Sequence, residues 1–204
     1  APLSAKSIKN IHGVLHKALK QAVLIGYLRT NPTEACILPR IIRKEMHPLE
    51  EDQVAVFLRE VQGHPHEYLY KIALFTGLRE GEVLGLGWEH IDLENGILTV
   101  KRQLRREQKK GGEYYFSPPK NNKSRCLTLA PSVIQLFRLQ KLEQNSMRME
   151  AGDAWEEHGL IFTNQTGGYL SYRTVYDCFK RIVRNIGAPA TRFHDLRHTF
   201  AVAS

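Results

Sequence analysis

Two predicted helices meet at Thr76-Gly77-Leu78-Arg79-Glu80-Gly81-Glu82. Apolar residues recur with helical spacing from Leu69 to Thr76, and Gly77 is a typical residue to end a helix. Arg79 then lies at the first turn of the next helix, where the helix dipole and free backbone N–H groups add to its positive charge. The stretch therefore predicts a turn that binds an anion such as a phosphate. The alternative is a surface ion pair between Arg79 and Glu82, which would contribute only about 0.3–0.5 kcal/mol.

A second cluster suited to anions lies near the end of the chain, in Phe193-His194-Asp195-Leu196-Arg197-His198-Thr199. Helical spacing places the His194 imidazole and the Arg197 guanidinium on one face, with Leu196 and Phe200 on the opposite face. The occurrence of two such clusters in one domain favours a shared anion site over two unrelated surface features.

The remainder of the chain after residue 48 alternates predicted helices with short predicted strands. The apolar pattern predicts helices around Val54–Val61, after Pro131 and after a capping Ser171. Strand-like runs at residues 96–101, 113–116 and 125–129 predict three short antiparallel strands. We therefore expect a mainly α fold with a small antiparallel β-sheet, which is an α+β class.

The N-terminal segment, residues 1–35, predicts one amphipathic helix from Ser7 to about Leu28, with a stop at Asn31-Pro32. One apolar stripe cannot enclose a core, so this helix must pack on something else: an upstream segment, DNA or a partner chain. Residues 36–47 are basic and extended by Pro39, which indicates an interdomain linker. We expect the linker to follow a DNA backbone, a solvated connector being the alternative. The basic residues expected to contact DNA are Arg40, Arg43 and Lys44.

The composition points to a polyanionic partner. The chain has 204 residues, a formal net charge of +8 and a pI near 9.5. Clustered Lys and Arg gain affinity for nucleic acid by releasing counterions, although a basic surface without a partner is the alternative. Cys36, Cys126 and Cys178 are scattered, which suggests neither a disulfide framework nor a site of paired cysteines. No apolar run is long enough for a membrane helix, so we expect a protein of the bacterial cytoplasm, associated with the nucleoid.

The stretches Thr76 to Leu86 and His194 to Thr199 closely resemble the two signature boxes of the tyrosine recombinases, also called phage integrases. Two boxes in this order are far more specific than either alone. The chain is most similar to the integrases of conjugative transposons. The resemblance implies a catalytic domain over residues 48–204, preceded at residues 1–35 by the last helix of a core-binding domain.

The resemblance also implies which residues act. In this family the arginine of the first box and the histidine and arginine of the second surround the scissile phosphate, which implies Arg79, His194 and Arg197 as catalytic residues. Glu82 matches an acidic position that we interpret as holding Arg79 in place. His198 is interpreted as a supporting residue that packs near the site.

A catalytic lysine lies on a β-hairpin between the boxes in family members. Lys120 fits that position best, and Lys123 is the other candidate because Asn121 replaces the usual threonine. We also expect Arg125, at the start of a predicted strand, to contact DNA.

The chemistry of these residue types agrees with such a role. Guanidinium groups offer fixed forks to the non-bridging oxygens of a phosphorane, and a lysine of lowered pKa can protonate a departing 5′-oxygen. His194 can transfer a proton near neutral pH. No carboxylate cluster for a metal ion is evident, so we expect no metal and no other cofactor. The alternative is a zinc hydrolase, since His194 to His198 mimics H-E-x-x-H, but Arg197 would repel the ion and a third ligand is needed.

The resemblance implies site-specific recombination of mobile DNA through a 3′-phosphotyrosyl link, without ATP. The nucleophilic tyrosine is expected downstream of Ser204, so the chain alone is expected to be inactive. The expected partners are double-stranded DNA, a homo-tetramer on that DNA and an accessory directionality factor. The alternative is a non-catalytic DNA-binding fragment or a regulator derived from an integrase.

Overall fold

The computed structural model describes residues 2–42, 46–109, 111–119 and 122–203, the side chains of residues 200–203 excepted. The chain divides into two compact units, Ala1–Glu45 and Met46–Ser204. Lys120, Arg43 and Lys44, three of the residues singled out in the sequence, lie outside the described residues.

The N-terminal unit consists of helix α1 (Ala5–Leu24) and a short 3-10 helix at Pro32–Ala35. The α1 helix begins where the Ser4 hydroxyl accepts a hydrogen bond from the Ser7 N–H. It ends at Leu24, four residues before the predicted end at Leu28. The segment after it returns along the helix, since the Thr33 carbonyl oxygen lies 3.0 Å from His12 Nε2. No residue of α1 is buried within the described chain, in agreement with a single apolar stripe.

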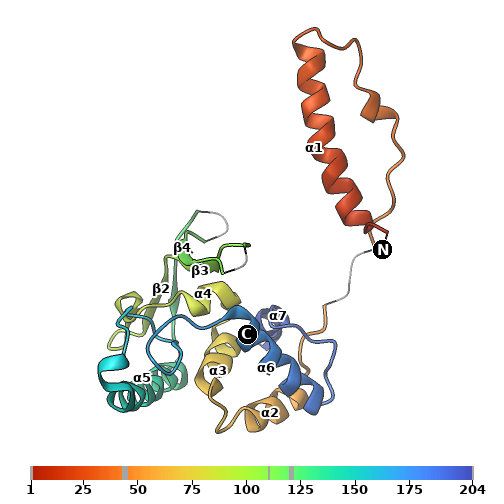
Figure 1. Cartoon of the computed structure of the whole chain (residues 1–204). Helices are drawn as coiled ribbons and strands as arrows, with labels where there is room; N and C mark the ends of the chain where they lie inside the picture. The colour runs from red at the N-terminus through yellow and green to blue at the C-terminus, as the bar shows by residue number, and fades with distance from the viewer. Residues whose placement is uncertain (1, 43–45, 110, 120–121, 204) are drawn as a thin grey trace. The chain divides into compact units, whose positions relative to one another are not determined.

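The second unit holds the other helices (Figure 1). The helices predicted around Val54–Val61, Leu69–Thr76, Pro131 and Ser171, and at the C-terminal cluster, are all present. Phe57, Tyr70 and Phe179 lie at the centre of the core, with edge-to-face ring contacts, and are essentially inaccessible to solvent. The helix bounds are α2 Glu51–Glu60, α3 Glu67–Thr76, α4 Glu80–Leu84, α5 Pro131–Ala151, α6 Tyr172–Asn185 and α7 Asp195–Ala203.

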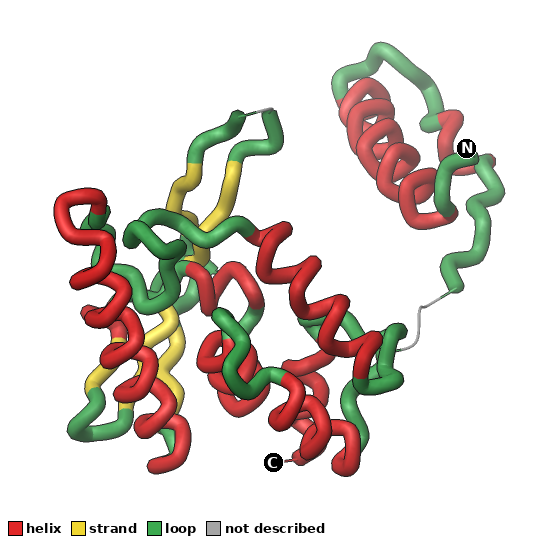
Figure 2. The backbone as a smooth tube through the Cα atoms, turned by 60° about the horizontal axis from the view of Figure 1, so that its bottom comes forward, coloured by secondary structure: helices red, strands yellow, loops and turns green. Residues whose placement is uncertain are grey.

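The strands form two small antiparallel sheets rather than one group of three. One sheet has the order β1-β2-β5, and the other is the hairpin β3-β4. The three predicted runs correspond to β2, β4 and β5. The sequence did not predict β1, which has two residues, or β3, which is mostly polar with only Leu104 buried. The three-stranded sheet lies beside α5 (Figure 2). The strand bounds are β1 Ile91–Asp92, β2 Ile97–Val100, β3 Gln103–Arg106, β4 Tyr114–Ser117 and β5 Arg125–Thr128.

Close packing of α4 against β3 fixes the turn that carries Arg79. A Cβ added to Gly85, at the end of α4, would lie 2.7 Å from the Leu104 backbone nitrogen. Only glycine permits this approach of two backbones. The α3 helix in turn packs against α7, so the two clusters recognised in the sequence belong to adjacent elements.

Candidate active site

Arg79 occupies the N-cap position of α4 and is paired with Glu82 in the first turn. The Glu82 carboxylate accepts hydrogen bonds from the Arg79 backbone N–H and from Arg79 Nη1, both at 2.9 Å. The Glu82 side chain is only 1% exposed, whereas that of Arg79 is 36% exposed. The Arg79–Glu82 ion pair considered as the alternative from the sequence is therefore present, but its carboxylate is buried and its guanidinium is partly exposed to solvent.

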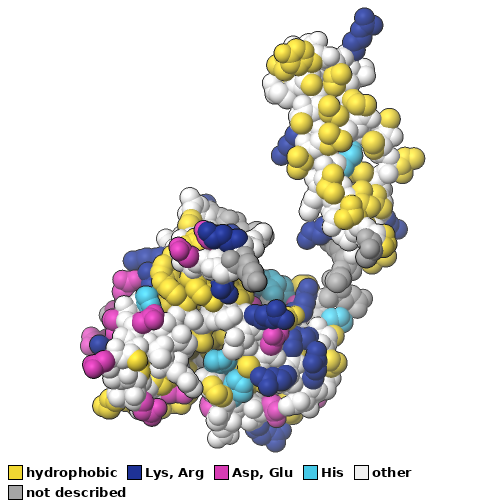
Figure 3. All heavy atoms as spheres, viewed as in Figure 1, with side chains coloured by type: hydrophobic (Ala, Val, Ile, Leu, Met, Phe, Trp, Pro, Cys, Tyr) yellow, Lys and Arg dark blue, Asp and Glu magenta, His cyan; other side chains and the backbone are white. Residues whose placement is uncertain are grey.

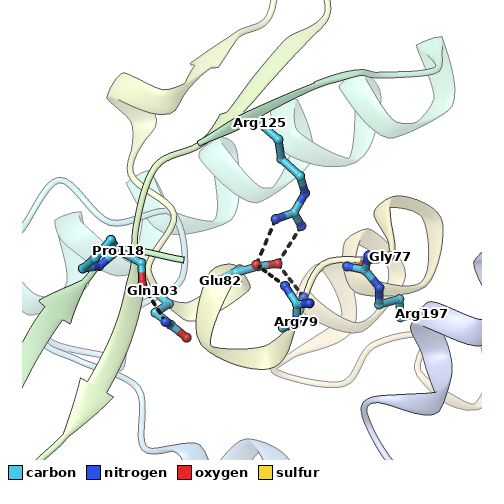
Figure 4. A network of polar contacts seen from close by, with 7 residues as sticks. All are labelled: Gly77, Arg79, Glu82, Gln103, Pro118, Arg125 and Arg197. Carbon is cyan, nitrogen blue, oxygen red and sulfur yellow. Dashed lines mark hydrogen bonds and ion pairs between the residues drawn. The ribbon is translucent and has the colours of Figure 1, made fainter. Parts of the chain in front are cut away.

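Arg125, the first residue of β5, binds the same carboxylate. Its Nη1 lies 2.9 Å from Glu82 Oε1 and its Nη2 lies 2.7 Å from Oε2, which is a bidentate pair (Figure 4). Burial alone would raise the pKa of Glu82, but hydrogen bonds from Arg125 and Arg79 outweigh it and lower the pKa to about 2. Glu82 is thus a carboxylate at every physiological pH.

Arg197 brings the second cluster to the first. Its Nη1 donates to the Gly77 carbonyl oxygen at 3.0 Å, across 120 residues of sequence (Figure 4). Gly77 ends α3 in the left-handed conformation, with φ of 59°, which glycine adopts readily. Burial, and then the charges of Arg79 and Arg125, lower the pKa of Arg197, against a smaller opposite effect of Glu82.

These side chains form a cluster with an excess of positive charge. Two guanidinium groups, those of Arg79 and Arg125, bind the Glu82 carboxylate, and their positive charges also act on Arg197. A bound anion would offset this repulsion. The charge of Arg79, from the first sequence box, thus acts on Arg197, from the second.

His194 lies directly before α7, which begins at Asp195, rather than within the helix as the sequence suggested. Partial burial, followed by the charges of His198, Arg79 and Arg197, lowers the pKa of His194. Its ring meets that of His198 edge to face at a centroid distance of 5.4 Å. A neutral imidazole beside two arginines can both donate and accept a proton.

Sequence reasoning missed the residues that hold this turn. The Asp195 carboxylate is fully buried and accepts from the Arg192 backbone N–H at 2.9 Å and from Arg192 Nη2 at 2.7 Å. The Thr199 hydroxyl accepts a hydrogen bond from the Leu49 N–H at 2.9 Å. The available signal was the acidic residue at the first position of a predicted helix, where a carboxylate can cap free N–H groups.

Lys123 and Arg40 are the other predicted site residues that the structure describes. Lys123 is exposed in the segment between β4 and β5, two residues before Arg125. Arg40 is exposed and belongs to the N-terminal unit. Lys and Arg side chains are frequent over α6 in Figure 3, whereas Asp and Glu are frequent over α5.

Within the described ranges, no three His, Cys, Asp or Glu side chains gather as metal ligands would. None of the helices described is both long and apolar enough to span a lipid bilayer.

The comparisons with known proteins identify the family to which this fold belongs. Residues 47–203 match the phage integrase family, and the chain belongs to this family. It is 28% identical to a XerC-like tyrosine recombinase of Caldanaerobacter subterraneus subsp. tengcongensis, over 97% of this chain and 55% of the relative. It is also 28% identical to an integrase of Streptomyces ambofaciens, over 97% of this chain and 52% of the relative.

Among solved structures, the chain is similar to the Tn1549 transposon integrase in complex with transposon right end DNA. The TM-score is 0.82 at 25% identity, over 98% of this chain and 67% of that one. This similarity confirms the mostly helical fold with small antiparallel sheets and the resemblance to a conjugative-transposon integrase. The chain spans about half the length of the curated relatives it matches.

Proposed function

We propose that this chain is the catalytic part of a site-specific DNA recombinase that cuts and rejoins mobile DNA through a 3′-phosphotyrosyl intermediate. The observation that carries the proposal is the hydrogen bond from Arg197 to Gly77, two residues before Arg79, together with the action of the Arg79 and Arg125 charges on Arg197. A phosphodiester is the anion that such a cluster, in a chain of net charge +8, is suited to bind. The similar Tn1549 integrase binds transposon DNA.

In the proposed reaction, a tyrosine hydroxyl oxygen forms a bond to phosphorus while the bond from phosphorus to the 5′-oxygen breaks. The non-bridging oxygens gain negative charge on the way, and Arg79 and Arg197 stabilise it with forked N–H groups. The tyrosine loses a proton and the 5′-oxygen gains one. His194, held neutral by its surroundings, is suited to the first transfer, and Lys120 or Lys123 to the second.

The freed 5′-hydroxyl then attacks a phosphotyrosyl link on a partner strand, which restores a phosphodiester and releases the tyrosine. The number of phosphodiester bonds is unchanged, so the reaction needs no ATP. We propose a tetramer on two duplexes, assisted by a directionality factor, with Arg40, Arg43 and Lys44 following the DNA backbone. We assign none of the eight tyrosines of this chain as the nucleophile.

Covalent trapping tests the proposal. The full gene product is incubated with its own element's end DNA carrying a nick next to the cleavage site, so that the 5′-hydroxyl fragment is lost and rejoining cannot occur. We expect a protein–DNA adduct that survives denaturant and is absent from Arg197→Ala. Salt-sensitive DNA binding without an adduct would overturn the recombinase proposal and favour a non-catalytic regulator. DNA binding that is insensitive to salt would overturn both proposals.

A further inference from the structure

We propose that Arg125 is a positioning residue which, through the shared Glu82 carboxylate, fixes the Arg79 guanidinium in the orientation that receives a phosphate. The inference rests on the proposed function and names a residue outside both sequence boxes. In this proposal Arg125 acts through Glu82, and the DNA contact expected from the sequence is the alternative.

Four hydrogen bonds fix the orientation of the Glu82 carboxylate. Each oxygen accepts one hydrogen bond from Arg125 and one from Arg79: Oε1 from the two Nη1 atoms, and Oε2 from Arg125 Nη2 and the Arg79 N–H. Rotation of the carboxylate would break bonds to both arginines at once. Since Glu82 is 1% exposed, water does not replace a lost partner there.

The two arginines differ in what they leave free. Within the described part of the chain, Arg79 uses only Nη1 of its guanidinium, so Nε and Nη2 have no protein acceptor. Arg125 directs one N–H of each terminal nitrogen to Glu82, which leaves the second N–H of each and the Nε–H. Arg79, with Nε and a whole terminal nitrogen unused, is therefore the residue presented to an anion, and Arg125, which binds both carboxylate oxygens side by side, is the residue that holds Glu82.

The backbone of Arg125 is anchored by the sheet. Arg125 is the register partner of Val100 in the β2-β5 pair, and Val100 is fully buried. The guanidinium thus reaches Glu82 from a rigid strand, whereas Arg79 lies in a turn between helices. A planar fork suits this task and an ammonium does not, since only the fork can contact both carboxylate oxygens at fixed angles.

Substitution of Arg125 separates positioning from DNA contact. In the full gene product on the nicked end DNA, Arg125→Lys and Arg125→Gln should each lower the single-turnover cleavage rate at saturating DNA about 10- to 100-fold, with the dissociation constant of the DNA changed less than about 3-fold. The control is Arg148→Gln, which removes an equal charge from an exposed pair with Glu157 and should leave both quantities unchanged. A Lys variant that cleaves normally, or a Gln variant whose loss is mainly in affinity, would overturn the proposal in favour of a phosphate contact.

A double-mutant cycle tests whether Arg125 acts through Arg79. If it does, Arg125→Gln should have little further effect on the residual cleavage rate in an Arg79→Ala background. Equal fold-losses in the two backgrounds would show an independent role and overturn the proposal. Urea unfolding of each variant establishes that it is folded. If Arg125→Gln does not fold, Arg125→Lys, which keeps the charge, replaces it in the cycle.

A readout without catalysis keeps this inference separate from the proposed function. In the NMR spectrum of this chain, the Arg79 guanidinium signals, identified by their loss in Arg79→Ala, should show restricted rotation. They should become rotationally averaged in Arg125→Gln and not in Arg148→Gln. If the wild-type gene product forms no DNA adduct, the recombinase proposal fails, but the NMR comparison still tests the coupling of Arg125 to Arg79. Unchanged Arg79 signals in Arg125→Gln would overturn that coupling.

Discussion

Arg197 donates from Nη1 to the carbonyl oxygen of Gly77 at 3.0 Å, which joins α7 to the turn that precedes Arg79. The glycine that ends α3 thus also sets the position of an arginine 120 residues later in the chain. Because the bond uses one terminal nitrogen, the rest of the Arg197 fork has no acceptor among the residues that the structure describes.

Replacement of Arg197 tests its role in transition-state stabilisation. Arg197→Ala should lower the cleavage rate of the full gene product about 10²- to 10³-fold, by loss of a donor to the developing charge. DNA affinity and the urea midpoint should change little, because Arg197 is one of many cations and its protein contact is a single carbonyl. Quenched-flow cleavage on nicked DNA measures the rate, and a variant that cleaves at the wild-type rate would remove Arg197 from the site.

The two candidate lysines can be told apart by the leaving group. Lys120→Ala and Lys123→Ala are compared on DNA with a normal 5′-bridging oxygen and with sulfur at that position. A thiolate leaves without a proton, so the sulfur substrate should restore cleavage to the variant that lacks the general acid, and not to the other. Restoration of neither would assign proton donation to another residue.

The buried carboxylate of Glu82 makes stability depend on pH in acid. Its pKa of about 2 lies below the ordinary 4.5, so its stabilisation is fully present above pH 4.5 and is lost as the pH falls towards 2. Glu82→Gln should therefore lower the free energy of unfolding by about 2 kcal/mol at pH 7, with a smaller loss near pH 3. Urea titrations at both pH values measure this, and a loss that stays constant would contradict the ion-pair explanation.

The neighbouring Glu80 predicts the opposite pH dependence. Burial raises its pKa to about 8, and its Oε1 has no hydrogen-bond partner within the described residues. A raised pKa in an acid means that the folded state prefers the protonated form, so stability is lost as the pH rises from 4.5 to 8. Glu80→Gln should stabilise the protein by on the order of 3 kcal/mol at pH 9 and little at pH 4. Equal effects at the two pH values would show that Glu80 is not protonated in the fold.

The helices and the pair of sequence boxes could be predicted because their signals are local. The apolar period before Gly77 and the capping position at Ser171 gave the bounds of α3 and α6 to within a few residues. The first-turn position of Arg79 and its proximity to Glu82 also follow from spacing alone. Local spacing could not show that the Glu82 carboxylate is buried, which changes a weak surface pair into a fixed anchor.

What the sequence could not supply depends on contacts between distant segments. The β3 strand is polar along most of its length and is formed by pairing with β4, not by its own pattern. Arg125 was recognised as a basic residue at a strand start, but nothing local indicates that it faces Glu82, 43 residues earlier. The bond from Arg197 to Gly77 is likewise a product of the packing of α7 against α3.

Arg79 and Arg197 are proposed to act on one phosphate, and cleavage of DNA in which that phosphate is uncharged tests this most directly. Replacing one non-bridging oxygen of the scissile phosphate by a methyl group removes the negative charge that the two guanidinium groups would neutralise. Cleavage by Arg79→Ala and by Arg197→Ala should be nearly lost on normal DNA and should recover at least about 10-fold on the methylphosphonate, relative to wild type. Failure of the neutral substrate to rescue either variant would contradict the account.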